Sequence, residues 1–395
     1  MKILVVHSYY QQRGGEDGVF IAERDLLQRI GNDVHTFEAF NDEATALNYF
    51  TLVKKSIWNE DIAIQIEEIV KARGIEVVHF HNTFPLISAA AYSAARRAGA
   101  AVVQTVHNYR MLCVNGTLLR NDRPCELCVG KIQISGVVHG CYRDSSLASS
   151  VVATMNTFHQ LRGTFRNDVD LYIAPTNFVR DKLIKGGLFP SRIVVKPHFV
   201  NSQQVTKTEK GDAAIYVGRL SKEKGVDTLI AAWKKLNGRL PLKIIGDGPL
   251  SDAVALATKE ISGVSWLGRL PPDEVRRHVA EARMLVNPSI CYETFGLTIV
   301  EAFAATTPVV VSGHGAFAEI VLDGITGLHF SPSDSSDLAE KVLFLCDHPT
   351  FSAEISNNGR AEYEQKYTPE QNFSLLMAHY QEAILNRSRE KMVAR

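Results

Sequence analysis

Short apolar runs alternate with amphipathic stretches through both halves of the chain. In the first half the apolar runs span residues 3–7, 77–81, 102–107 and 171–174, and each is followed by a polar or glycine-bearing loop. Runs of this length are typical of buried parallel strands. Helical periodicity lies between them, at residues 19–29, 62–73 and 89–97. This order predicts an α/β fold with a doubly wound sheet.

The pattern begins afresh in the second half, with apolar runs at residues 214–217, 242–245, 264–267, 284–286 and 309–312. Between the halves, residues 201–212 are polar and lack apolar periodicity, which is typical of a linker. We therefore expect two Rossmann-like domains, over residues 1–200 and 201–370. The tail, residues 371–395, is predicted to be an amphipathic helix that returns to the first domain.

Composition agrees with a globular protein of two domains. The chain has 395 residues, of which 45% are hydrophobic and 22% charged, and a domain usually takes about 150 residues. The 43 basic and 43 acidic residues balance, so nothing in the net charge calls for a nucleic-acid partner.

The first residues lack the basic start, apolar stretch and cleavage site of a signal peptide. No apolar run approaches the roughly 18 residues that span a bilayer. We therefore expect a cytoplasmic protein. Basic residues at 54–55, 96–97 and 110–143 leave open a peripheral contact with anionic lipid at the inner face of the membrane.

The segment ETFGLTIVE, from Glu293 to Glu301, places two carboxylates eight positions apart around a predicted helix start. A helix that begins near Gly296 or Leu297 offers N–H groups and the positive end of its dipole to a diphosphate. Glu301 would then reach the hydroxyls of a ribose, and Glu293 those of a sugar beyond the phosphates. The alternative is that both are ordinary acids flanking a helix.

A second candidate loop, Gly218 to Gly225, directly follows an apolar run. Its Arg219 and Lys224 are both cationic and both beside glycine, which suits them to neutralising a pyrophosphate leaving group. Two such cations and a helix N-terminus make a catalytic metal dispensable. The alternative, a solvated charge run that opens a surface helix, explains poorly why Arg219 follows a buried strand.

Other glycine-bearing loops follow predicted strands. Gly14 and Gly15, after the first strand, would let the backbone approach a phosphate or sugar, although the order of glycines is not that of a dinucleotide-binding fingerprint. Gly248 lies in a Gly-Asp-Gly turn that either walls a nucleotide pocket or is an ordinary turn. Arg269, after the next strand, is either near a base edge or on the surface.

Taken together, these motifs resemble glycosyltransferase family 4, whose members are retaining enzymes with the two-domain GT-B fold. The resemblance rests on Gly218-Arg-Leu with Lys224-Gly, on Gly246-Asp-Gly-Pro, on the Glu293 to Glu301 segment and on Gly315 to Glu319, within residues 213–330. It implies transfer of a sugar from a UDP- or GDP-sugar to an acceptor hydroxyl. Bacterial polysaccharide or lipid-linked glycan assembly is the setting it implies.

The resemblance also implies roles for single residues. Arg219 and Lys224 would clamp the diphosphate, Glu301 would hold the ribose, Glu293 would contact the donor sugar and His107 would face that sugar from the first domain. His107 could instead be structural, and His7, His79 and His81 also end predicted strands. The candidate donor-binding residues are Gly14, Gly15, Gly218, Gly248, Arg269, Thr294, Phe295, Gly296, Leu297 and Glu301.

The mechanism expected on these grounds is a front-face attack, in which the leaving phosphate oxygen takes the acceptor proton. The rival is a double displacement through a covalent intermediate on Glu293. Two other classes stay open. A sugar-nucleotide epimerase on the same fold would need acid and base carboxylates in the first domain, and a catalytically silent binding protein would keep the donor site alone.

Four cysteines after His107 depart from the common family pattern. Cys113, Cys125, Cys128 and Cys141 lie within 29 residues and include one C-x-x-C pair. Four thiolates can enclose a tetrahedral zinc ion, which would be structural because no coordination position stays open. Free packed thiols and a redox or cluster role are the alternatives.

Overall fold

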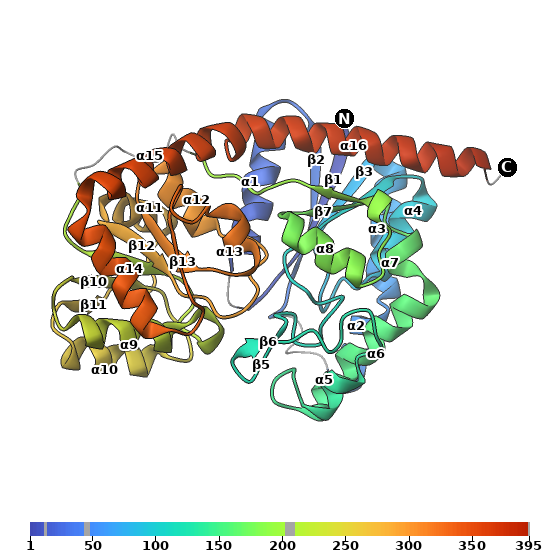
Figure 1. Cartoon of the computed structure of the whole chain (residues 1–395). Coiled ribbons are helices and arrows are strands. Elements are labelled where there is room, and N and C mark those ends of the chain that lie inside the picture. Colours follow the sequence, from blue (N-terminus) through green and yellow to red (C-terminus); the bar gives the residue numbers. More distant parts are fainter. Residues whose placement is uncertain (12–13, 43–47, 202–209, 394–395) are drawn as a thin grey trace. The chain divides into compact units, whose positions relative to one another are not determined.

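The computed structural model describes residues 1–11, 14–42, 48–201 and 210–393. Contacts group the chain into two units (Figure 1). The first comprises residues 1–117, 126–197 and 372–395, and the second comprises residues 118–125 and 198–371. Most of the predicted linker, residues 202–209, lies outside the described residues. No helix in the described ranges is long and apolar enough to cross a bilayer.

The first unit is built on a six-stranded parallel sheet with the order β2-β1-β3-β4-β7-β8. The strands are β1 (Lys2–Tyr9), β2 (Asp33–Phe40), β3 (Val77–Asn82), β4 (Ala101–Thr105), β7 (Leu171–Ala174) and β8 (Ile193–Val195). Its helices are α1 (Gly15–Arg29), α2 (Tyr49–Ile57), α3 (Glu60–Arg73), α4 (Ala90–Ala98), α5 (Ile134–Val138), α6 (Ser146–Arg162), α7 (Thr164–Asn167) and α8 (Asn177–Lys185).

The last helix, α16 (Pro369–Val393), contributes to the core of the first unit. Its Leu376, Tyr380 and Ala383 are fully buried and pack in one cluster with β1, β3, β4 and β7. The apolar runs of these strands are therefore covered partly by the opposite end of the chain.

The second unit repeats the architecture, with the sheet order β11-β10-β9-β12-β13-β14, all parallel. Its strands are β9 (Ala214–Val217), β10 (Leu242–Ile245), β11 (Val264–Trp266), β12 (Met284–Asn287), β13 (Val309–Ser312) and β14 (Leu328–Phe330). Its helices are α9 (Val226–Leu236), α10 (Ser251–Glu260), α11 (Pro272–Glu281), α12 (Leu297–Ala304), α13 (Gly315–Ile320), α14 (Ser335–Asp347) and α15 (Pro349–Lys366). A short hairpin, β5 (Leu119–Arg120) and β6 (Arg123–Pro124), groups with this unit.

Two apolar clusters sandwich the second sheet. Ala214 and Tyr216 face one cluster with α9, α10 and α14, whereas Ile215 between them faces the other with α11, α12 and α13. Alternate residues of a strand point to opposite faces, so a strand covered on both sides needs apolar residues throughout. The α/β class with two parallel sheets, as predicted from those runs, is confirmed.

Candidate functional site

Glycines allow the loops after β9 and β10 to touch. Gly246 has a φ of 141°, and a Cβ there would lie 1.9 Å from the carbonyl oxygen of Gly218. Gly248, with a φ of 156°, approaches the carbonyl of Leu220 in the same way. Any side chain at these positions would collide with backbone. The Gly218 loop and the Gly246-Asp-Gly turn are therefore one packed wall at the carboxyl end of the sheet.

Lys224 and Glu293 meet across neighbouring strands at that end. Lys224 Nζ lies 2.6 Å from Glu293 Oε1, and the hydroxyl of Ser289 donates to the same oxygen at 2.5 Å. Burial alone would lower the pKa of Lys224, but Glu293, together with Cys291 and Tyr216, outweighs burial and raises this pKa above its usual value. Lys224 therefore keeps its positive charge throughout the physiological pH range.

The backbone around this ion pair is held closely. Gly225, next to Lys224, has a φ of 71°, and a Cβ there would lie 1.8 Å from the carbonyl oxygen of Pro288. Ser289 Oγ also lies 3.0 Å from the carbonyl oxygen of Glu223. The loops after β9 and β12 thus hold each other, which positions the lysine and the glutamate that they carry.

Helix α12 begins at Leu297 after Gly296, as the sequence predicted. Its N-cap residue, Gly296, has no side chain with which to bond the first N–H groups, and the positive end of the helix dipole lies at the loop after β12. Phe295 anchors the loop by packing its ring 5.0 Å from that of His198. Glu301 lies in the second turn, where burial raises its pKa to about 7, against an opposing effect of Arg276.

The remaining candidates of the second unit differ in exposure. Arg219 and Arg269 are exposed, and Thr294 and Leu297 are half-buried. His314 is a neighbour that the sequence did not single out: its Nε2 donates to the carbonyl of Ser289 at 3.0 Å. The motif from Gly315 to Glu319, which follows it directly, was the available signal.

In the first unit, the four histidines at predicted strand ends have different surroundings. His7 is buried against Asp17, with Nε2 2.7 Å from Oδ1. His79 lies between Tyr380 and Thr105, at 2.7 Å from each hydroxyl. His107 is partly exposed, and its Nε2 lies 3.0 Å from Nδ1 of the buried His81.

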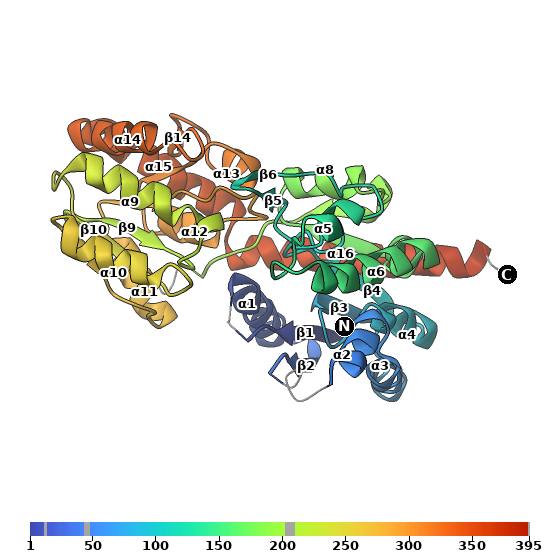
Figure 2. The same cartoon turned by 90° about the horizontal axis from the view of Figure 1, so that it is seen from below.

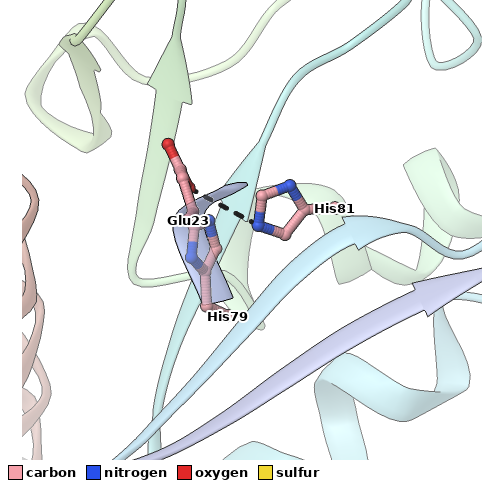
Figure 3. Close-up of side chains that lie close together, drawn as sticks. All are labelled: Glu23, His79 and His81. Carbon is pink, nitrogen blue, oxygen red and sulfur yellow. Dashed lines mark ion pairs between the residues drawn. The ribbon is translucent and has the colours of Figure 1, made fainter. Parts of the chain in front are cut away.

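Glu23, His79 and His81 bring their ligand atoms within 4.8 Å of one another (Figure 3). They are fully or almost fully buried, and burial lowers the pKa of His79 to about 4, so that this ring is neutral. The ammonium of Lys196, also buried, lies 2.6 Å from Glu23 Oε1. A cation of the chain itself thus balances this carboxylate, which makes the cluster a structural ion-pair network rather than a fitting metal site.

The glycine loop of the first unit leads into a carboxyl group that the sequence did not identify. Gly14 caps α1, and its N–H donates to Asp17 at 2.9 Å, while Gly15 opens the helix. The next residue, Glu16, accepts from Asn82 at 3.2 Å. Burial and the charge of Asp17 raise the pKa of Glu16 to about 8.

A pocket opens beside His107 within the first unit. It has about 70 Å³ of room for water-sized molecules, enough for several waters or part of a larger ligand. Amide, hydroxyl and aromatic groups line it, among them Asn82, Phe84, Asn108 and Asn156. Asn156 is fully buried, and its Oδ1 has no hydrogen-bond partner among the residues that the structure describes.

The structure does not gather the four cysteines into a metal site. In the described part of the chain, three or more metal-binding side chains converge only at Glu23, His79 and His81. Cys113 donates to Asn115 at 3.0 Å, and Cys125 lies in the residues that group with the second unit. Zinc binding by Cys113, Cys125, Cys128 and Cys141 stays a prediction.

Two family models match the two halves of the chain. The model described as Glycosyltransferase Family 4 matches residues 25–204, and the one described as Glycosyl transferases group 1 matches residues 199–362. An uncharacterized glycosyltransferase of Methanocaldococcus jannaschii is 29% identical over 93% of this chain and 94% of its own length. The alpha-monoglucosyldiacylglycerol synthase of Acholeplasma laidlawii is 29% identical over 56% of this chain and 62% of its own.

Solved structures share the fold over almost the whole chain. The sucrose-phosphate synthase of Thermosynechococcus elongatus has a TM-score of 0.71 at 16% identity and covers both chains completely. Anabaena HepE in complex with UDP has a TM-score of 0.67 at 18% identity, covering 96% of this chain and 100% of its own. A further structure of HepE contains UDP-glucose, with the same TM-score at 16% identity.

Proposed function

We propose that this chain, which belongs to glycosyltransferase family 4 and has the GT-B fold, transfers a sugar from a UDP- or GDP-sugar to an acceptor hydroxyl with retention of the anomeric configuration. The observation that carries the proposal is the Lys224–Glu293 pair beside the start of α12. A permanent cation, a carboxylate and a helix N-terminus together suit a glycosyl diphosphate. The UDP and UDP-glucose complexes of the structural neighbours support a nucleotide-sugar donor.

In the proposed donor complex, different residues bind the diphosphate, the ribose and the sugar of the donor. Lys224 and Arg219 neutralise the diphosphate together with the N–H groups of α12, which makes a catalytic metal unnecessary. Glu301 accepts hydrogen bonds from the ribose, and Glu293 accepts them from the donor sugar. His107 is the candidate of the first unit for a contact with a sugar.

The proposed mechanism is front-face attack, in which the leaving phosphate oxygen accepts the proton of the acceptor hydroxyl. The contacts of Glu293 support this choice over a covalent intermediate. One of its oxygens already accepts from both Lys224 and Ser289, and a carboxylate held in this way is a weaker nucleophile. A covalent glycosyl adduct on Glu293 would overturn the proposal.

We propose a glycan or lipid-linked glycan as acceptor, reached at the inner face of the membrane. Family membership supports a carbohydrate acceptor, and the name of the relative from Acholeplasma laidlawii describes synthesis of a glucosylated diacylglycerol. Epimerisation of the donor is the second candidate, because Glu16 supplies a first-unit carboxyl group of raised pKa. Analysis of products with and without acceptor separates the two activities.

A thermal-shift screen against nucleotide sugars tests the donor site, because a ligand that binds the folded state raises the apparent stability. We expect Glu301→Ala to weaken the shift and Lys224→Ala to lower turnover by on the order of a hundredfold, the scale of a lost transition-state contact. Lys234→Ala, at an exposed ion pair with Glu260, is the control and should change neither. Normal donor binding and turnover in both site variants would refute the assignment.

A further inference from the structure

Exposed apolar side chains gather on three helices of the first unit, α2, α5 and α6. The two views of the structure both show these helices side by side (Figures 1 and 2). We call this the α2–α6 surface and define it by Phe50, Ile134, Val138, Leu147, Phe158 and Leu161. All six are exposed, Phe50 by 84% and Leu161 by 83%. Large apolar side chains so open to water, on helices that contact one another, are typical of a binding surface.

Helix α6 carries an apolar stripe on its outer face. Leu147, Val151, Phe158 and Leu161 are spaced so that they share one side of the helix, with Thr154 between them. Between Ser146 and Leu161 the sequence has no acidic or basic residue except His159, which is buried on the opposite side. Helix faces exposed to solvent normally carry charged residues. The lack of charge on this face therefore indicates that it binds another surface.

The helices are joined firmly enough to present their side chains together. His159 Nε2 lies 2.8 Å from the carbonyl oxygen of Ile57, at the end of α2. The ring of Trp58 packs edge-to-face on that of Phe158, with their centroids 6.0 Å apart. The guanidinium carbon of Arg162 lies 4.4 Å from the centroid of the Trp58 ring. The apolar side chains therefore sit on a rigid platform with cationic groups at its margin.

Basic residues outnumber acidic ones on the α2–α6 surface, although Lys55 pairs with Asp61 at its edge, at 3.0 Å. Residues 48–58 and 127–162 contain five basic residues, Lys54, Lys55, Lys131, Arg143 and Arg162, and one acidic residue, Asp144. Lys54, Lys131, Arg143 and Arg162 are exposed. The whole chain has no net charge, so this local excess is a property of the surface.

We propose that the α2–α6 surface docks on an anionic lipid bilayer, with its apolar side chains in the headgroup region and its basic residues against lipid phosphates. Anionic lipid would interact with both the exposed apolar side chains and the basic residues of this surface. A second copy of the chain would match only the apolar side chains, because a symmetric interface would set the five basic residues against their own copies.

The buried side of the same helices lines the pocket beside His107. Ser56 of α2 and Met155 and Asn156 of α6 are among its lining residues. Docking would therefore hold this pocket close to the lipid headgroups, where an acceptor attached to lipid is presented. This benefit rests on the proposed function, whereas the docking itself is measurable without donor or acceptor.

Cosedimentation of the full-length protein with vesicles tests the proposal. We expect binding to vesicles of equimolar phosphatidylcholine and phosphatidylglycerol, weaker binding to phosphatidylcholine alone, and a loss of binding as salt is raised. Leu147→Ser combined with Leu161→Ser should weaken binding by on the order of tenfold, and Lys54→Gln by about fivefold. Both leucines are exposed, so the double variant should fold.

The matched control replaces two exposed apolar residues of the second unit, Leu256→Ser with Ile325→Ser, and should bind like the wild type. Equal vesicle binding by all variants, or none by the wild type, would overturn the proposal. A concentration-dependent dimer abolished by the Leu147/Leu161 variant, without vesicle binding, would assign the surface to a second copy instead. Donor-induced thermal shifts in the same variants report on the proposed function separately.

Discussion

Glu301 combines a titratable group with a partly buried position in α12. Its pKa rises from 4.5 to about 7 because burial disfavours the charged form. Between these values the folded protein holds a proton that the unfolded chain has released, so the free energy of unfolding falls as the pH rises through this window. The carboxylate needed for the proposed ribose contact is therefore present at a cost in stability.

Glu301→Gln should remove that pH dependence. The variant should gain stability relative to the wild type at about pH 8 and little at about pH 5, measured by the melting temperature at both values. Glu260→Gln, at an exposed position of α10, is the control. A melting-temperature difference that does not change with pH would contradict the raised pKa of Glu301.

At the residue scale, the sequence predicted which side chains have suitable chemistry, but it did not predict which residues they contact. Lys224 and Glu293 were both singled out, yet their ion pair depends on β9 and β12 being neighbours in the sheet. Glu16 was missed because its pKa is raised by burial and by the charge of Asp17. The burial of Glu16 depends on the fold and cannot be recognised from a glycine-rich loop in the sequence.

At the scale of elements, the sequence predicted strands inside the sheets better than strands at their edges. β1, β3, β4, β9 and β12 are covered on both sides and appear as apolar runs. In the two parallel sheets, the strands that were missed, β2, β8 and β14, are all at sheet edges. β2 is largely half-buried and mixes polar with apolar residues, so a search for continuous apolar runs does not detect it.

The buried ion pair between α1 and the residue after β8 gives a prediction at this scale. Lys196→Met should leave the Glu23 carboxylate buried without its cation and lower the free energy of unfolding of the first unit by about 3–5 kcal/mol. Hydrogen exchange of the β1 and β3 amides measures this value. Combining Lys196→Met with Glu23→Leu should restore most of the lost stability. A double variant as unstable as Lys196→Met alone would show that the unpaired charge of Glu23 is not the cause.

At the scale of the whole molecule, the first unit is discontinuous in sequence. α16 supplies Leu376, Tyr380 and Ala383 to its core, and the hydroxyl of Tyr380 lies 2.7 Å from His79. The sequence indicated an amphipathic helix here, but its buried face became defined only by the strands it covers. The sequence analysis placed this helix against the first domain, but it did not identify the strands that the helix covers.

Ending the chain after Gln371 should expose that core. We expect the amides of β1 and β3 to lose most of their protection from hydrogen exchange, while those of β9 and β12 in the second unit keep theirs. A chain ending after Arg387 retains all three buried residues and serves as the control. Unchanged protection in the shorter chain would mean that α16 is dispensable for the first unit.

The place of α16 also bears on how the protein is made. A ribosome releases the chain from its N-terminus onward, and domains generally fold as they emerge. The second unit is complete once residue 371 has left the exit tunnel, whereas the first unit, although synthesised first, still lacks part of its core. During translation the first unit therefore completes its core after the second, once the residues of α16 have left the exit tunnel.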